Sequence, residues 1–174
     1  NVLAQEGGFA PFIDGSNQVV IDGGSPHPGV MDVVISAQGD ILLNTLAATD
    51  AATITSVGGT ILDINQASNN VTAQSLSLVA QGIIGQDGDA IETLVETFSA
   101  STTNGSIFLA PLLAGTAASV VASGAGNDVS IAAAVSSLRI QTISALGDVT
   151  VANGGGSLLD DNGAAVNVTG QIVS

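Results

Sequence analysis

Basic and large aromatic residues are almost missing from this sequence of 174 residues. One base, Arg139, stands against 15 acidic residues, and there is no Trp or Tyr, so the formal net charge is −14. Nucleic acids and anionic membrane surfaces are bound through clustered Lys and Arg, so this charge argues against both as partners. The acidic residues are scattered singly, which favours a solvated surface that resists non-specific association.

Cysteine is also missing, as is any long hydrophobic segment of the membrane-spanning type. The absence of Cys excludes a disulfide framework and thiol chemistry. The first residues, NVLAQEGG, lack the charged and apolar regions of a signal peptide, so we expect a processed chain or a piece of a longer one. Residues 97–127 are uncharged, but Pro111, four glycines and an alternating pattern favour a buried repeat segment over a membrane span.

The chain nevertheless has enough apolar residues for a core. Hydrophobic residues make up 45% of the sequence and aromatic residues 2%, so the core must consist of Val, Ile, Leu and Ala. Such small side chains suit a narrow, evenly spaced interior better than the centre of a compact globule, which aromatic residues usually fill. The 22 glycines, with many Ser, Thr, Asn and Asp, supply turns at short intervals.

An internal repeat organises the sequence. Residues 53–77, TITSVGGTILDINQASNNVTAQSLS, recur 97 residues later as TVANGGGSLLDDNGAAVNVTGQIVS at 150–174, with twelve of 25 positions identical. The shared residues include Asp63/Asp160 and the Asn-Val-Thr that begins at Asn70 and at Asn167. Repetition over this length is typical of repeat architectures.

A second periodicity comes from glycines and short strands. Glycines at 15, 39, 59, 82, 105, 126, 147 and 170 are 20–24 residues apart, and most precede an aliphatic pair, as in GDILL and GSIFL. Alternation of apolar and polar residues beside them predicts strands, whereas no segment keeps a helical period over ten residues. The best helical candidate, Ala90–Thr97, is expected to be a loop excursion. The 97-residue shift does not coincide with the glycine period, which suggests that each rung has two or more turn sites.

These patterns predict an all-β parallel β-solenoid with rungs of about 20–23 residues. Residues 32–174 form the solenoid, in which the second copy of the 97-residue repeat is incomplete. Residues 1–31 hold three of the four prolines and form an N-terminal cap or extension, with one strand at 17–21. The alternation predicts that nine side chains point inward: Ile61, Leu76, Leu78, Ile107, Val129, Ile131, Ile140, Val149 and Val151.

The strings GDILLNTL, GGTILD, NNVTAQSLSLVAQGIIG and ETFSASTTNGSIFLA resemble the repeats of filamentous-haemagglutinin-like bacterial exoproteins. The resemblance covers residues 32–174. It implies a right-handed parallel β-helix and an extracellular or cell-surface role in adhesion, matrix or filament formation. The secretion domain with which such proteins usually begin has no counterpart in this sequence.

Few residues suggest chemistry. Asp87, Asp89 and Glu92 in GQDGDAIE place oxygen ligands around a glycine turn, which suits calcium, although a solvated acidic loop is the alternative. Asp160 begins a weaker candidate, Asp-Asp-Asn, which has one carboxylate more than its counterpart at Asp63. No other cofactor is expected. Because only Arg139 could bind an acidic sugar or stabilise negative charge, we do not expect an enzyme.

Two functions remain. The first is a structural solenoid of the bacterial cell surface or extracellular matrix that assembles head-to-tail into filaments, with residues 1–31 meeting the open C-terminal end of the next copy. The alternative is the stalk, or the glycan-binding or cell-binding section, of a large adhesin. The absence of Trp and Tyr favours the first, because sugars are commonly bound on exposed aromatic side chains.

Overall fold

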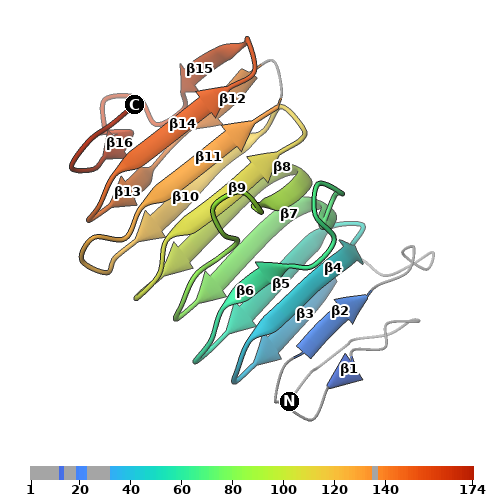
Figure 1. Ribbon diagram of the computed structural model, residues 1–174. Coiled ribbons are helices and arrows are strands. Elements are labelled where there is room, and N and C mark those ends of the chain that lie inside the picture. The colour runs from blue at the N-terminus through green and yellow to red at the C-terminus, as the bar shows by residue number, and fades with distance from the viewer. Residues whose placement is uncertain (1–11, 14–18, 23–31, 135–136) are drawn as a thin grey trace.

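The computed structural model describes residues 12–13, 19–22, 32–134 and 137–174, and its described strands form one β-solenoid (Figure 1). Parallel strands stack in about six turns, so the predicted all-β solenoid is confirmed. Among the described residues there is no helix that could span a membrane.

Each rung contributes strands to two faces. The first face is formed by β2 (Val19–Asp22), β4 (Ile41–Ala47), β6 (Ile61–Asp63), β9 (Ile107–Pro111), β11 (Val129–Ala133) and β14 (Val149–Asn153). The second face is formed by β3 (Asp32–Ala37), β5 (Ala51–Ser56), β10 (Thr116–Ala122), β12 (Ser137–Ile140), β13 (Ile143–Ala145), β15 (Ser157–Asp160) and β16 (Val168–Thr169). The long strands β7 (Val71–Ala80) and β8 (Ile91–Thr102) pair with strands of both faces.

The core consists of columns in which each rung contributes one inward side chain. On the first face the backbone register stacks residues 41, 61, 84, 107, 129, 149 and 173, all of them Val or Ile. From Ile41 onward, successive members are 20, 23, 23, 22, 20 and 24 residues apart. These numbers of residues per turn agree with the predicted rung length.

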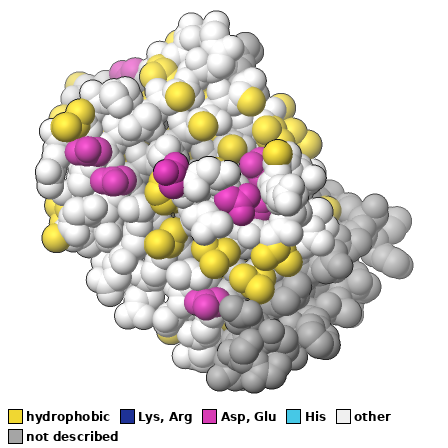
Figure 2. Space-filling view, viewed as in Figure 1, with side chains coloured by type: hydrophobic (Ala, Val, Ile, Leu, Met, Phe, Trp, Pro, Cys, Tyr) yellow, Lys and Arg dark blue, Asp and Glu magenta, His cyan; other side chains and the backbone are white. Residues whose placement is uncertain are grey.

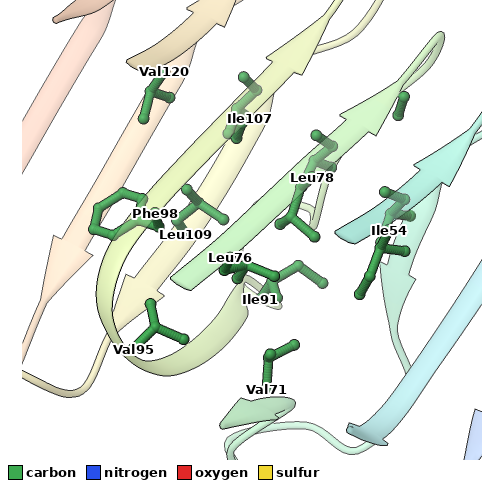
Figure 3. Close-up of a cluster of buried hydrophobic side chains, with 14 of the residues drawn as sticks. Ile54, Val71, Leu76, Leu78, Ile91, Val95, Phe98, Ile107, Leu109 and Val120 are labelled. Atoms are coloured by element: carbon green, nitrogen blue, oxygen red, sulfur yellow. The ribbon is translucent and has the colours of Figure 1, made fainter. Parts of the chain in front are cut away.

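Buried side chains from both faces meet in the narrow interior (Figure 3). Eight of the nine predicted inward residues are buried, and Val151 is partly buried against the same cluster. Phe98 is the largest fully buried side chain, and it lies near Leu109, Leu76 and Val95 in the middle rungs (Figure 3). The predicted aliphatic core is therefore confirmed, and among the residues with described side chains it includes one aromatic residue, Phe98.

Glycine marks the corner that precedes the first face because the rungs approach each other closely there. A Cβ atom on Gly105 would lie 2.4 Å from the carbonyl carbon of Gly82 in the rung below. At the same corner, acidic side chains join rungs: Asp40 accepts a hydrogen bond of 2.9 Å from the Thr60 N–H, and Asp128 accepts one of 2.7 Å from the Asp148 N–H. The periodic glycines and aspartates thus fix the turn between rungs.

One sequence prediction was wrong. Residues 90–97 do not form a loop excursion, since Ile91–Thr97 belong to β8, whose inward side chains include Ile91 and Val95. Their alternation is broken because two consecutive side chains, Glu96 and Thr97, are exposed where the strand passes between faces. The strand expected near residues 17–21 is present as β2.

The disagreement between the 97-residue repeat and the glycine period has a geometric cause. Four turns lead from Ile41 to Val129, which is 88 residues. A shift of 97 residues therefore carries Ile41 of β4 on the first face to Leu138 of β12 on the second face. The repeat copies local structure onto the other face of the solenoid.

We predict that Ile107→Asp lowers the free energy of unfolding by about 3–5 kcal/mol, because it places an unpaired charge in a fully buried column. Ser130→Asp is the matched control, because Ser130 lies at a partly exposed position of the neighbouring strand β11 and the change should cost about 0.5 kcal/mol or less. Denaturant unfolding measures both values. Equal effects of the two substitutions would contradict the assigned orientation of the first face.

Candidate functional site

A cluster of acid and amide side chains interrupts the apolar interior on the first face. Asp63 stacks on Leu43 of the rung below and is buried, and Asn70 is fully buried. Between them, residues 64–69 form a short excursion from the rung. Asp63 Oδ1 accepts hydrogen bonds from the Asn65 N–H, at 2.8 Å, and from the Asn70 side-chain amide.

Asn70 joins three consecutive rungs. Its side-chain amide donates to the carbonyl oxygens of Leu43 and Asn44 in the rung below, both at 3.1 Å. Toward the rung above, its Oδ1 accepts from the Glu92 N–H at 2.8 Å, and its own N–H donates to the Glu92 carbonyl at 3.0 Å. A buried amide with every group satisfied stabilises one register between rungs.

Carboxyl groups gather around this cluster, and the pKa of two of them, Asp63 and Glu92, is raised. Burial, together with the nearby charges of Asp63 and Asp89, raises the pKa of Glu92 to about 7. Burial likewise raises the pKa of Asp63 above its usual range, although hydrogen bonds from Asn65 and Asn70 oppose the shift. One oxygen of each carboxyl, Asp63 Oδ2 and Glu92 Oε2, is buried without a hydrogen-bond partner among the described residues.

The structure does not gather the three predicted calcium ligands into one group. Asp89 and Glu92 lie near Asp63, whereas Asp87 is exposed in the tight turn closed by the pairing of Gln86 with Asp89. Within the described part of the chain, no group of three or more His, Asp or Glu residues is arranged to hold a metal ion. Calcium at Asp87, Asp89 and Glu92 stays a prediction, and sequence reasoning missed Asp63 because it lies 24 residues before Asp87.

The cluster recurs in the second copy of the repeat. Asp160 Oδ1 accepts from the Asn162 N–H and from the Asn167 side-chain amide, both at 2.9 Å, and these bonds lower the pKa of Asp160. The Asn167 amide also donates to the Ile140 carbonyl at 2.7 Å. Each bond copies one made by Asp63, Asn65 or Asn70, now on the second face.

The surroundings of the two copies differ, because no described rung covers the second one. Two side chains in inward positions near the last rung, Leu158 and Val173, are 48% and 54% exposed. At the other end of the solenoid, Val33 and Ile35 of β3 are only 8% and 1% exposed. The inward side chains of the last described rung are thus exposed, and we call this rung the terminal rung (residues 149–174).

The sides of the solenoid offer shallower features. A groove of about 590 Å³ lies along Glu96, Thr116, Arg139 and Leu159. The Arg139 guanidinium lies 3.4 Å from the Asp161 carboxylate, and the Arg139 side chain is more than half exposed. The open groove brings together Glu96 and Arg139, which do not form a nucleophile–base pair. The terminal rung is therefore the better candidate for a functional surface.

Glu92 predicts a pH dependence of stability. Its pKa is higher in the folded chain than the ordinary value of 4.5, so protonation stabilises the fold below pH 4.5, and this stabilisation is lost as the pH rises through about 7. After solvent screening we expect about 1–2 kcal/mol, which raises the melting temperature by about 3–6 °C between pH 7.5 and pH 5.

Glu92→Gln should reduce this rise, because glutamine has nearly the same shape and does not titrate. Glu96→Gln is the matched control, since Glu96 is exposed on the same strand and its replacement removes an equal charge. Thermal unfolding at both pH values, in the presence of a chelator, gives the comparison. A rise that both variants retain in full would show that general charge repulsion, and not Glu92, is its source.

Comparison with protein-family models, with curated proteins and with solved structures finds no match to this chain. The resemblance to filamentous-haemagglutinin-like repeats therefore stays a prediction. Any functional conclusion must come from the geometry of the solenoid itself, and its most distinctive surface is the terminal rung.

Proposed function

We propose that this protein is a structural β-solenoid of the bacterial cell surface or extracellular matrix that assembles end to end into filaments. One observation carries the proposal: the inward side chains of the middle rungs are buried by stacking on the rungs above and below, so a rung without a neighbour presents apolar side chains and strand edges. Exposed apolar residues beside unpaired strand edges favour the addition of further strands.

The distribution of charge supports contact through the ends. Acidic side chains are spread over the side of the solenoid seen in Figure 2, where no basic side chain is visible. Two copies that approach side by side would bring like charges together, and the net charge of −14 makes this unfavourable. At the terminal rung, Leu158, Val173 and Ile172 provide apolar area instead.

The two ends of the solenoid differ, so contact between them is heterologous. A head-to-tail contact of this kind does not close on itself, and it produces a filament. Residues 1–31 would take part from the opposite end; most of them lie outside the described residues, but β1 (Phe12–Ile13) is antiparallel to β2, unlike the parallel ladder that follows. A surface or matrix location follows from the resemblance, and a chain without cysteine suits export.

We expect the double substitution Leu158→Lys with Val173→Lys to raise the concentration needed for assembly more than tenfold, because it removes apolar contact and adds charge at the open end. Val57→Lys with Val79→Lys is the matched control, since these side chains are 52% and 39% exposed on the sides of the solenoid. Light scattering over a concentration series and negative-stain images provide the measurement.

Assembly of the control and loss of assembly in the terminal-rung variant would support the proposal. A parent chain that remains monomeric at high concentration would overturn it and would favour a stalk section of a larger adhesin. Equal assembly of both variants would show that the copies associate through another surface.

A further inference from the structure

Asp63 carries a buried oxygen that the folded chain does not satisfy. Its side chain is 5% exposed, and its Oδ1 accepts hydrogen bonds from the Asn65 N–H and from the Asn70 side-chain amide. Its Oδ2 has no hydrogen-bond partner among the described residues. A buried carboxylate oxygen of this kind is unfavourable unless a donor or a cation satisfies it.

The groups that approach the Asp63 carboxyl from the next rung are themselves acidic. Asp89 lies within hydrogen-bonding reach of Asp63, and Glu92 is close enough for its charge to interact with both. Because Asp63 Oδ1 already accepts two hydrogen bonds, Oδ2 is the oxygen that remains for Asp89. A tight turn positions Asp89, since Gln86 and Asp89 exchange backbone hydrogen bonds of 3.0 Å and the Gln86 side-chain amide donates to Asp89 Oδ2 at 3.3 Å.

No described basic side chain compensates these acids. Arg139 is the only Lys or Arg in the sequence, and it lies on β12 of the second face, where it pairs with Asp161. Two carboxyl groups in contact cannot both ionise unless a positive charge lies between them. For Asp63 and Asp89 that charge must come from solution, as a proton at low pH or as a metal cation at higher pH.

We infer that Asp63 and Asp89 bind one divalent cation between two consecutive rungs, and that calcium fits the site best. Asp63 Oδ2 and a carboxylate oxygen of Asp89 are the protein ligands, water completes the coordination, and Glu92 adds negative charge nearby. In the described part of the chain no three acidic side chains are arranged around one ion, so the site has two carboxylate ligands. Calcium accepts such an irregular set of oxygens, whereas magnesium demands near-octahedral geometry.

Asp63 thus replaces Asp87, which the sequence pattern suggested as a ligand. The ion would join two rungs of the interior of the solenoid, so the site does not depend on the end-to-end assembly proposed above.

Thermal unfolding of the full chain at pH 7.5 tests the site, with calcium chloride compared with a chelator at equal ionic strength. We expect about 10 mM calcium to raise the melting temperature by about 3–10 °C, as for a Kd of about 0.1–1 mM, and magnesium to raise it less. Asp63→Asn should abolish the rise. It keeps an oxygen for the Asn65 and Asn70 donors and places an amide at the unsatisfied position, so in chelator it should melt no lower than the parent chain.

Asp89→Asn should also abolish the rise, and Asp87→Asn is the matched control that should retain it. Asp87 is exposed in the same turn, so its replacement removes an equal charge and reports the general effect of calcium on a chain with a net charge of −14. Calcium should also displace the proton held by the cluster. Calorimetry at pH 6.5 in two buffers of different ionisation enthalpy should therefore show proton release from the parent and from Asp87→Asn, but not from Asp63→Asn.

The site is overturned if calcium does not stabilise the parent chain, or if it stabilises the parent and all three variants equally. Loss of the rise in Asp87→Asn with its retention in Asp63→Asn would also overturn the site, because the ligands would then lie in the exposed turn. None of these measurements requires filaments, so a chain that never assembles can still confirm the cation site.

Discussion

The stacking of inward aliphatic side chains from consecutive rungs is the interaction on which the whole structure depends. Neighbouring strands lie about 4.8 Å apart, so each inward position must hold a side chain that fits between identical positions above and below. The column through Ile41, Ile61, Ile84 and Ile107 meets this condition with the same residue four times. The interior is consequently too narrow for many aromatic residues, and the composition shows the same restriction.

The acid and amide cluster places polar side chains in this aliphatic interior, and these side chains select one register between rungs. An aliphatic column tolerates a slip by one rung, because every rung presents similar side chains. Asn70 does not tolerate it, because its buried amide is satisfied only when Leu43 lies below and Glu92 lies above. The raised pKa of Glu92 follows from the same burial and gives the fold a dependence on pH. Asn167 extends this selection of register to the end of the described solenoid.

Much of the fold could be predicted because the constraint acts on local pattern. Alternation predicted inward residues such as Ile107 and Val149, and the glycine spacing predicted the rung length, because close backbone approach leaves only glycine at the corner. The path of the chain around the interior was harder to predict. Ile91–Thr102 passes between faces at Glu96 and Thr97, which are both exposed, so its alternation is broken and it does not look like one strand.

The candidate site could be predicted only in part. The repeat marked Asp63, Asn70, Asp160 and Asn167 as related, yet no sequence pattern shows that Asp63 and Glu92, 29 residues apart, share a buried site. Their proximity depends on the number of residues per rung, which varies between 20 and 24 along the first face. For the same reason, the difference between a covered copy of the cluster and an open one required the structure.

Amide hydrogen exchange resolved by residue tests the central claim most directly, because it reports which rungs are covered on both sides. In the monomeric chain, the column residues Ile61 to Val129 should exchange slowly, and the amides of the terminal rung above Val149 should exchange at least about a hundredfold faster. On assembly, protection should increase at Asn167 and its neighbours while the middle rungs change little. Equal protection along the whole monomer, or no change at the terminal rung on assembly, would contradict a solenoid held together by stacked columns with one open end.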